Sequence, residues 1–281
     1  MSAAPHRRQV LTTLIGATGA LFLPIPSARA EPVRFEGHFE QGGMVVGRTV
    51  PGATVSLAGR AIRVSDDGVF VFGFGRDDKA TASLVVRVPG EAAQTQRLDI
   101  VQRSYDIQKI DGLPDKQVTP PDDAVARINR DNKLIGAARS HDTHETWFAG
   151  GLSWPVTGRI SGVYGSQRIL NGQPRRPHYG VDIAKGEGEP IHAPQAAIVR
   201  MAETDMYFTG GTTILDHGGG ITTSYLHQSR LDVKVGDTVG KGQVIGLIGK
   251  TGRATGPHLC WRLNWFQERL DPQLAAPPMP S

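Results

Sequence analysis

Short apolar runs separated by glycine are the feature that most restricts what this chain can fold into. Beyond Trp154 these runs have the length of β-strands, and no long helical periodicity interrupts them. They lie at 198–201, 212–215, 221–226 and 244–248. The 281 residues include 35 Gly and 19 Pro, which favours turn-rich β structure over helices. We therefore predict a mostly β protein whose C-terminal part is an antiparallel β-rich domain.

A second group of short strands is predicted in the N-terminal part, from residue 31 to about 103. The apolar or alternating runs occupy 54–57, 61–64, 69–72, 83–88 and 96–100. Strands at this spacing predict a β-sandwich-like module of the immunoglobulin-like type. No polar cluster converges within it, so we interpret the module as a spacer or a docking unit.

The segment 104–150 is predicted to be a connector with a short helix. Thr119 is placed as the N-cap, with proline at the first helical position. The apolar residues of this segment fall on one helical stripe, namely Val125, Ile128, Ile135 and Ala138. Two glycines then break the chain, and the last domain is predicted to span 151–278.

Residues 1–30 have the pattern of an export signal. A charged start with Arg7 and Arg8 precedes an apolar stretch over 10–23, and Ala28-Arg29-Ala30 predicts cleavage before Glu31. The paired arginines are similar to a twin-arginine signal. The apolar stretch is too short and interrupted for a stable membrane span after cleavage, although an uncleaved anchor is the alternative. We expect an exported protein of the periplasm or cell envelope.

The charge distribution argues against nucleic acid as a partner. Much of the formal charge of +4 comes from three arginines within the predicted signal, which contains no acidic residue. The rest of the chain has no basic stripe of the kind that binds a phosphate backbone.

Candidate metal ligands gather in the last domain. His178 and Asp182 supply an imidazole and a carboxylate, both of which bind Zn²⁺, although a surface histidine with a capping aspartate would explain the pair alone. His227 follows in Tyr-Leu-His, and His258 and Cys260 follow in Gly-Pro-His-Leu-Cys. In a strand, His258 and Cys260 share one face, so one can bind the metal while the other addresses a substrate.

This order of residues resembles the lysostaphin-type (LytM-like) zinc metallopeptidases, a family of peptidoglycan endopeptidases. The resemblance runs from near Trp154 to about residue 272. It implies a Zn²⁺ cofactor, with His178 and Asp182 as the first two ligands. It also implies that His227 lies near the scissile bond and that His258 acts on the substrate or the attacking water. Cys260 occupies the position of the third ligand, which is normally histidine.

Cys260 leaves three interpretations open. The thiolate ligates zinc in an active enzyme, or the site binds metal poorly and the domain only binds the wall or regulates another hydrolase, or another metal or third ligand is used. Thiolate is an established zinc ligand. Because it carries a negative charge where histidine is neutral, we expect a weaker Lewis acid. As the only cysteine of an exported chain, Cys260 has no partner for an internal disulfide.

The other histidines of interest are interpreted as structural or open. His217 either borders the site or is a satisfied histidine in a turn, His192 is structural, and His141 and His144 belong to a solvated linker. The sequence thus predicts a zinc-dependent endopeptidase acting on peptidoglycan peptides, with a degenerate, non-catalytic wall-binding module as the alternative.

Overall fold

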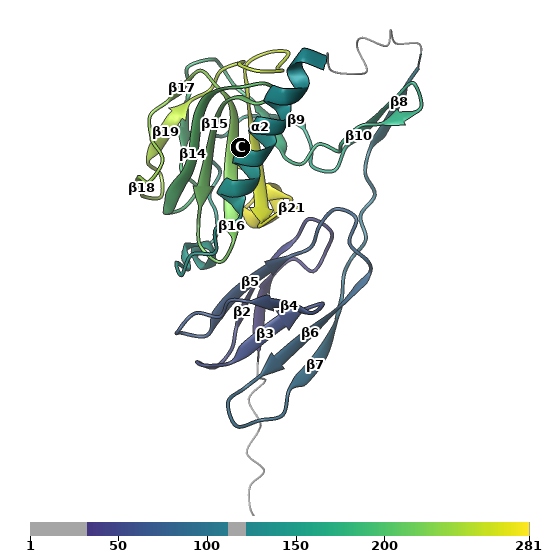
Figure 1. Ribbon diagram of the computed structural model, residues 1–281, viewed down its shortest axis with the longest axis vertical. Coiled ribbons are helices and arrows are strands. Elements are labelled where there is room, and N and C mark those ends of the chain that lie inside the picture. The colour runs from purple at the N-terminus through teal and green to yellow at the C-terminus, as the bar shows by residue number, and fades with distance from the viewer. Residues whose placement is uncertain (1–32, 112–121, 281) are drawn as a thin grey trace, which may run out of the picture. The chain divides into compact units, whose positions relative to one another are not determined.

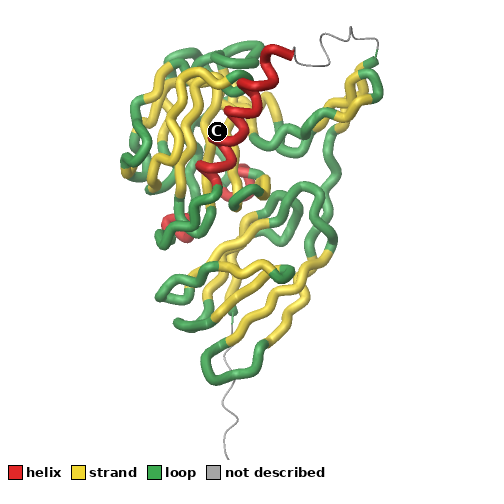
Figure 2. Tube along the Cα trace, viewed as in Figure 1, coloured by secondary structure: helices red, strands yellow, loops and turns green. Residues whose placement is uncertain are grey.

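The computed structural model describes residues 33–111 and 122–280, and these described residues belong to one compact unit. The predicted export signal and the Thr119 N-cap lie outside the described residues. Strands dominate, with helices confined to a few segments (Figure 2). Among the described helices, none combines the length and apolar character needed to cross a membrane.

The N-terminal part folds into two antiparallel sheets. The strands are β1 Arg34–Gly37, β2 Met44–Arg48, β3 Thr54–Leu57, β4 Arg60–Ile62, β5 Val69–Gly73, β6 Thr81–Arg87 and β7 Gln94–Asp99. One sheet has the order β1-β2-β5 and the other β4-β3-β6-β7. Phe70 and Phe72 of the first sheet and Leu84 of the second belong to the same buried cluster. The predicted strands are therefore present, while the immunoglobulin-like topology stays a prediction.

The connector contains more than the predicted helix. Helix α2 spans Asp122–Arg139, and β8 spans Ile107–Ile110. β8 pairs in parallel with β10, Gln167–Leu170, which also pairs with β11, Gln173–Pro174. The sequence did not indicate β8, because four residues with two polar members carry little pattern of their own.

Helix α2 packs against the main sheet through a small separate core. It contacts β14, Ala197–Met206, and β15, Gly210–Asp216, and crosses in front of this sheet in Figure 1. Ala138, with Leu134 and Ile135 beside it, packs on Met201 and Ile214. The predicted stripe was wrong at one position, because Val125 is exposed and its neighbour Ala124 is buried instead.

The C-terminal part is built on one large antiparallel sheet (Figure 1). Its order is β18-β14-β15-β16-β20-β12-β9, with β21 paired to β20. The strands are β9 Arg159–Gly162, β12 Val181–Ala184, β14 Ala197–Met206, β15 Gly210–Asp216, β16 Ile221–Gln228, β18 Thr238–Val239, β20 His258–Trp265 and β21 Glu268–Leu270. On β20, Leu259, Trp261 and Leu263 alternate into the main core, where each is fully buried. The residues between them therefore face the opposite side of the sheet.

Smaller elements complete this part of the chain. A second sheet has the order β13-β19-β17, formed by Pro190–His192, Val244–Leu247 and Arg230–Leu231. A 3₁₀ turn spans Trp147–Gly150, and α3 spans Pro272–Ala275. Asp271 caps α3 by accepting a hydrogen bond from the backbone N–H of Gln273.

Candidate metal centre

The pairing of β12 with β20 brings two of the predicted ligands together. Asp182 lies directly opposite Cys260, and Ala184 lies opposite His258. In an antiparallel pair, directly opposed side chains emerge on the same face of the sheet. The carboxylate of Asp182 and the thiol of Cys260 therefore meet on the face opposite the main core.

His178 reaches this face from the loop that precedes β12. Its backbone N–H donates to the carbonyl of Ser166 at 2.7 Å, and its own carbonyl accepts from Gly165 at 2.7 Å. Its ring Nδ1 lies 3.2 Å from the carbonyl oxygen of Val163, so Nδ1 carries the proton in the neutral ring. In that neutral tautomer Nε2 has the free lone pair that a metal ligand needs.

The three donor atoms fit a zinc ion. Nε2 of His178 lies 3.1 Å from Oδ1 of Asp182 and 3.5 Å from Sγ of Cys260, and all three atoms lie within 4.8 Å of one another. With ordinary zinc bond lengths, ligands of a tetrahedral ion are about 3.4–3.6 Å apart. One atom of His178, Nε2, faces both Asp182 and Cys260, as expected if all three bind one ion. In a catalytic triad the acid and the nucleophile would contact different nitrogens of the histidine ring.

Two further observations agree with a cation site. Oδ1 of Asp182 is buried and has no hydrogen-bond partner among the described residues, despite its short distance to His178. Burial lowers the pKa of His178, but the Asp182 and Cys260 side chains outweigh it and raise the pKa to about 10. The environment therefore favours positive charge at this point.

Cys260 has a second neighbour on its own strand. Arg262 lies two residues further along β20, and its Nε donates a hydrogen bond to Sγ at 3.4 Å. Gly180 makes room for this contact, because a Cβ there would meet Cγ of Arg262 at 2.7 Å and the carbonyl of Trp261 at 2.6 Å. The thiol is thus held between an imidazole and a guanidinium group.

His227 adjoins the centre in an uncommon backbone conformation. Its φ is 66°, a left-handed value that non-glycine residues seldom adopt outside constrained sites. Its Nδ1 lies 2.8 Å from the carbonyl of Thr251, which places the proton on Nδ1 and leaves Nε2 for a substrate. Burial lowers the pKa of His227 to about 4, so the ring is neutral near pH 7.

His258 stands beside His227 at the start of β20. The two ring centroids are 4.7 Å apart, and Nδ1 of His258 lies 2.8 Å from the carbonyl of Gly256. Its Nε2 lies 3.8 Å from Oδ1 of Asp182. His258 and Cys260 therefore both face Asp182, as the alternation along the strand predicts.

His217, whose role the sequence left open, is fully buried with both ring nitrogens engaged. Nδ1 pairs with the carbonyl of Ala196 at 2.9 Å, and Nε2 pairs with Oγ1 of Thr223 at 2.8 Å. Burial lowers its pKa to about 4. Both hydrogen bonds are internal to the fold, which favours the satisfied histidine over a substrate-facing one.

The other three histidines that were considered from the sequence lie in other surroundings. Nδ1 of His192 pairs with the carbonyl of Pro155 at 3.4 Å. His144 is in contact with Arg63, which also pairs with Asp142. His141 is exposed. The group of potential ligands found among the described residues contains none of these histidines.

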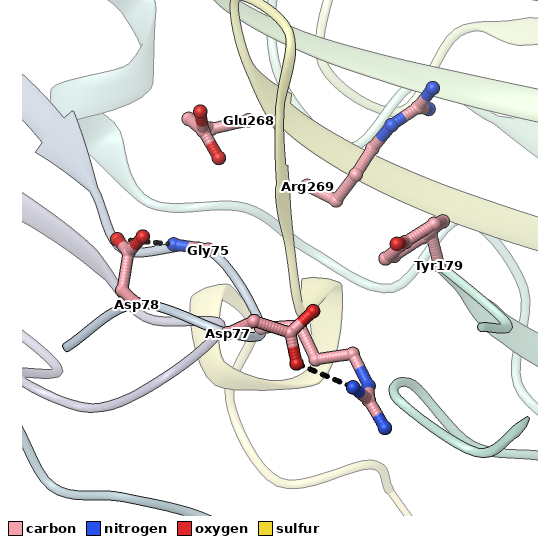
Figure 3. Close-up of a pocket in the computed structure, with 7 residues that line it drawn as sticks. Gly75, Asp77, Asp78, Tyr179, Glu268 and Arg269 are labelled. Atoms are coloured by element: carbon pink, nitrogen blue, oxygen red, sulfur yellow. Dashed lines mark hydrogen bonds and ion pairs between the residues drawn. The ribbon is translucent and has the colours of Figure 1, made fainter. Parts of the chain in front are cut away.

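A small hollow adjoins the loop that bears His178. It has a volume of about 180 Å³, and Tyr179 forms part of its wall (Figure 3). The other lining residues are Gly75, Arg76, Asp77, Asp78, Glu268 and Arg269. The hollow is therefore lined mainly by charged side chains.

Some residues around the centre were not singled out by their sequence context. Arg262 could have been found, since it follows Cys260 by two positions and strand alternation puts both on one face. Arg139 gives no such signal, because only the packing of α2 on the sheet brings it near this face.

Comparison with known proteins places this geometry in context. Residues 176–272 match the model of Peptidase family M23. Peptidoglycan DD-endopeptidase ShyA of Vibrio cholerae is 40% identical over 106 residues, covering 37% of this chain and 24% of the relative. DD-carboxypeptidase/endopeptidase Mpg of Neisseria meningitidis is 31% identical over 122 residues, covering 43% of this chain and 28% of the relative. The chain thus spans about a quarter of the length of these relatives.

One solved structure resembles much more of the chain. It is a peptidase M23 candidate from Pseudomonas aeruginosa, 28% identical, with a TM-score of 0.64. The likeness covers 84% of this chain and 93% of that one. The mostly β fold predicted from the sequence is therefore confirmed.

Proposed function

We propose that the protein is a zinc-dependent endopeptidase that hydrolyses peptide bonds of cell-wall peptidoglycan, since residues 176–272 match the model of Peptidase family M23. The observation that carries the proposal is the convergence of His178, Asp182 and Cys260 on one point. In this proposal residues 1–30 are the export signal, 31–103 a separate module, 104–150 the linker and 151–278 the peptidase domain.

The three residues would hold zinc through Nε2, a carboxylate oxygen and Sγ. A zinc ion bound there would supply a Lewis acid and a water of lowered pKa. The hydrogen bond from Nδ1 of His178 to the Val163 carbonyl keeps the imidazole oriented with Nε2 toward the centre. Burial excludes bulk water from Cys260, which is 2% exposed, and this strengthens the electrostatic interactions of its sulfur.

His227 and His258 are the proposed groups for proton transfer. Each has Nδ1 against a backbone carbonyl, so each presents Nε2 as the atom that can accept or return a proton. His258, nearer to Asp182, is the candidate for taking up a proton from the attacking water and returning it to the leaving amine. His227 is kept neutral with its proton on Nδ1, so its Nε2 accepts a hydrogen bond from an N–H of the substrate or from the attacking water and orients that group.

Cys260 decides between this proposal and a non-catalytic, wall-binding module. The test is zinc content beside digestion of purified peptidoglycan, for the wild type, Cys260→His and Cys260→Ala. We expect roughly stoichiometric zinc and digestion in the wild type, retained with Cys260→His and lost with Cys260→Ala. Wild-type protein that lacks both zinc and digestion, with both restored by Cys260→His, would overturn the active-enzyme proposal.

A further inference from the structure

Arginine side chains gather on the metal-bearing face of the main sheet. Arg262 lies beside Cys260 on β20, and Ser224 is its directly opposed neighbour on β16. From α2, Arg139 donates from Nη2 to Oγ of this same Ser224 at 3.4 Å. Arg139 and Arg262 are thus brought to one place by two elements distant in sequence.

Arg269 completes the group from β21. It lies directly opposite Asn264, which follows Arg262 by two positions on β20 and shares its face. Arg262 and Arg269 are partly exposed, whereas Arg139 is only 2% exposed. We call Arg139, Arg262 and Arg269 the arginine cluster.

The arginine cluster has no carboxylate partner among the described residues, and Arg262 has only the Cys260 sulfur beside its Nε. Other arginines of this domain have such a partner, as in the pair of Arg200 with the buried Asp216 at 2.9 Å. In the part of the chain that the structure describes, no member of the cluster forms an ion pair with a carboxylate. Nε and Nη1 of Arg139 and Nη1 of Arg269 are buried without a hydrogen-bond partner.

Nearby carboxylates are already engaged or directed elsewhere. Asp77 pairs with Arg76, and Asp78 accepts a hydrogen bond from the backbone of Gly75. Figure 3 shows the guanidinium group of Arg269 directed away from both carboxylates. Glu268, the third carboxylate of the hollow, precedes Arg269 on β21 and points away from its guanidinium group in Figure 3, so none of the three carboxylates pairs with Arg269.

Three guanidinium groups in these surroundings repel one another. Burial, and then the charges of Arg269 and Arg262, lower the pKa of Arg139 well below its ordinary value. A buried charge without a partner destabilises a fold, and an anion bound beside it removes that cost. Guanidinium groups hold carboxylates in particular, through paired N–H donors.

We propose that the arginine cluster is a substrate subsite that binds a carboxylate of an acidic peptide beside the metal centre. The inference rests on the proposed peptidase function and adds the chemical class of the peptide. Arg262 and Arg269, which are partly exposed, contact the carboxylate. The buried Arg139 adds positive charge without contacting the carboxylate itself. Nε of Arg262 is engaged with Cys260, which leaves its two terminal nitrogens as donors to the carboxylate.

The test measures binding and not hydrolysis. Full-length protein is titrated calorimetrically with an uncross-linked stem peptide of the cell wall, as the free acid and with its carboxylates amidated. We expect the wild type to bind the acid about tenfold more tightly than the amide, because hydrogen bonds between charged groups are stronger than those to a neutral amide. Arg269→Gln and Arg139→Met should each remove most of this preference.

Two controls make the result specific. Arg97→Gln changes an exposed arginine of the N-terminal part and should leave the preference intact. Zinc content is measured for every variant, because the cluster adjoins Cys260. Arg139→Met removes an uncompensated buried charge, so the thermal midpoint of the peptide-free protein should not fall.

Each outcome bears on one proposal. Equal binding of acid and amide by the wild type, or a preference that survives both cluster variants, would overturn the subsite. Inorganic phosphate that stabilises the wild type as much as the acidic peptide would assign the cluster to small anions and also overturn it. A preference for the acid without any wall digestion would support the subsite while contradicting the proposed peptidase activity.

Discussion

Nε of Arg262 donates a hydrogen bond to Sγ of Cys260 at 3.4 Å, so the only cysteine of the chain is paired with an arginine on its own strand. A thiolate ligand brings a negative charge that a histidine ligand would not. The adjacent guanidinium group compensates that charge. The arginine is therefore expected to matter for metal binding only while the ligand is a thiolate.

Arg262→Gln should weaken zinc binding about tenfold in the wild-type background, within the range typical of residues that support metal ligands. The same change in a Cys260→His background should have a much smaller effect. Competition with a chromophoric chelator measures both affinities. Equal losses in the two backgrounds would show that Arg262 acts on the fold and not on the sulfur.

Gly180→Ala should destabilise the protein by about 1–3 kcal/mol and reduce zinc content, since the new Cβ meets a backbone carbonyl and the stem of Arg262. Gly240→Ala is the matched control, because nothing lies within 4 Å of a Cβ at that position. Urea denaturation and metal analysis check both. A Gly180→Ala protein as stable and zinc-rich as the control would contradict the packing described for Cys260.

His227→Gln should reduce wall digestion by about 10²–10⁴-fold without changing zinc content, since the ring is proposed to act on the substrate and not on the metal. His192→Gln is the control, because that ring hydrogen-bonds to Pro155 away from the centre. Turnover of purified peptidoglycan and metal analysis are the measurements. Loss of zinc in His227→Gln would instead make this histidine a ligand.

Stability should fall as the pH is lowered from about 6.5 toward 4, because burial lowers the pKa of His217 to about 4. In this range the unfolded chain takes up a proton that the folded protein does not, so stability rises with pH. The contribution of His217 approaches about 3 kcal/mol across the window. His227, whose pKa is also lowered to about 4, acts in the same direction.

Urea titrations at several pH values measure this dependence. His217→Gln should be less stable at pH 7 and should show a shallower loss of stability on acidification. An unchanged slope in the variant would mean that His217 does not remain neutral in the folded protein.

Much of the fold followed from local pattern. The runs at 54–57 and 221–226 lie within β3 and β16, because alternation and bounding turns are properties of neighbouring residues. The helical stripe was wrong at Val125, since only the sheet against which α2 packs decides which helix face is buried. β8 was missed for a related reason, as its partner β10 lies far along the chain.

For the candidate site, the sequence by itself determined which residue types occur and in what order, including a cysteine where the family resemblance leads us to expect a histidine. It also determined that His258 and Cys260 share a face, because side-chain alternation along a strand is local. Only the tertiary structure decided that His178 lies 3.5 Å from Cys260, a residue 82 positions away. The pairing of β20 with β16 and β21 and the packing of α2 also decided that Arg139, Arg262 and Arg269 lie on the face that carries this thiol, because such pairings depend on the whole sheet and not on any one segment.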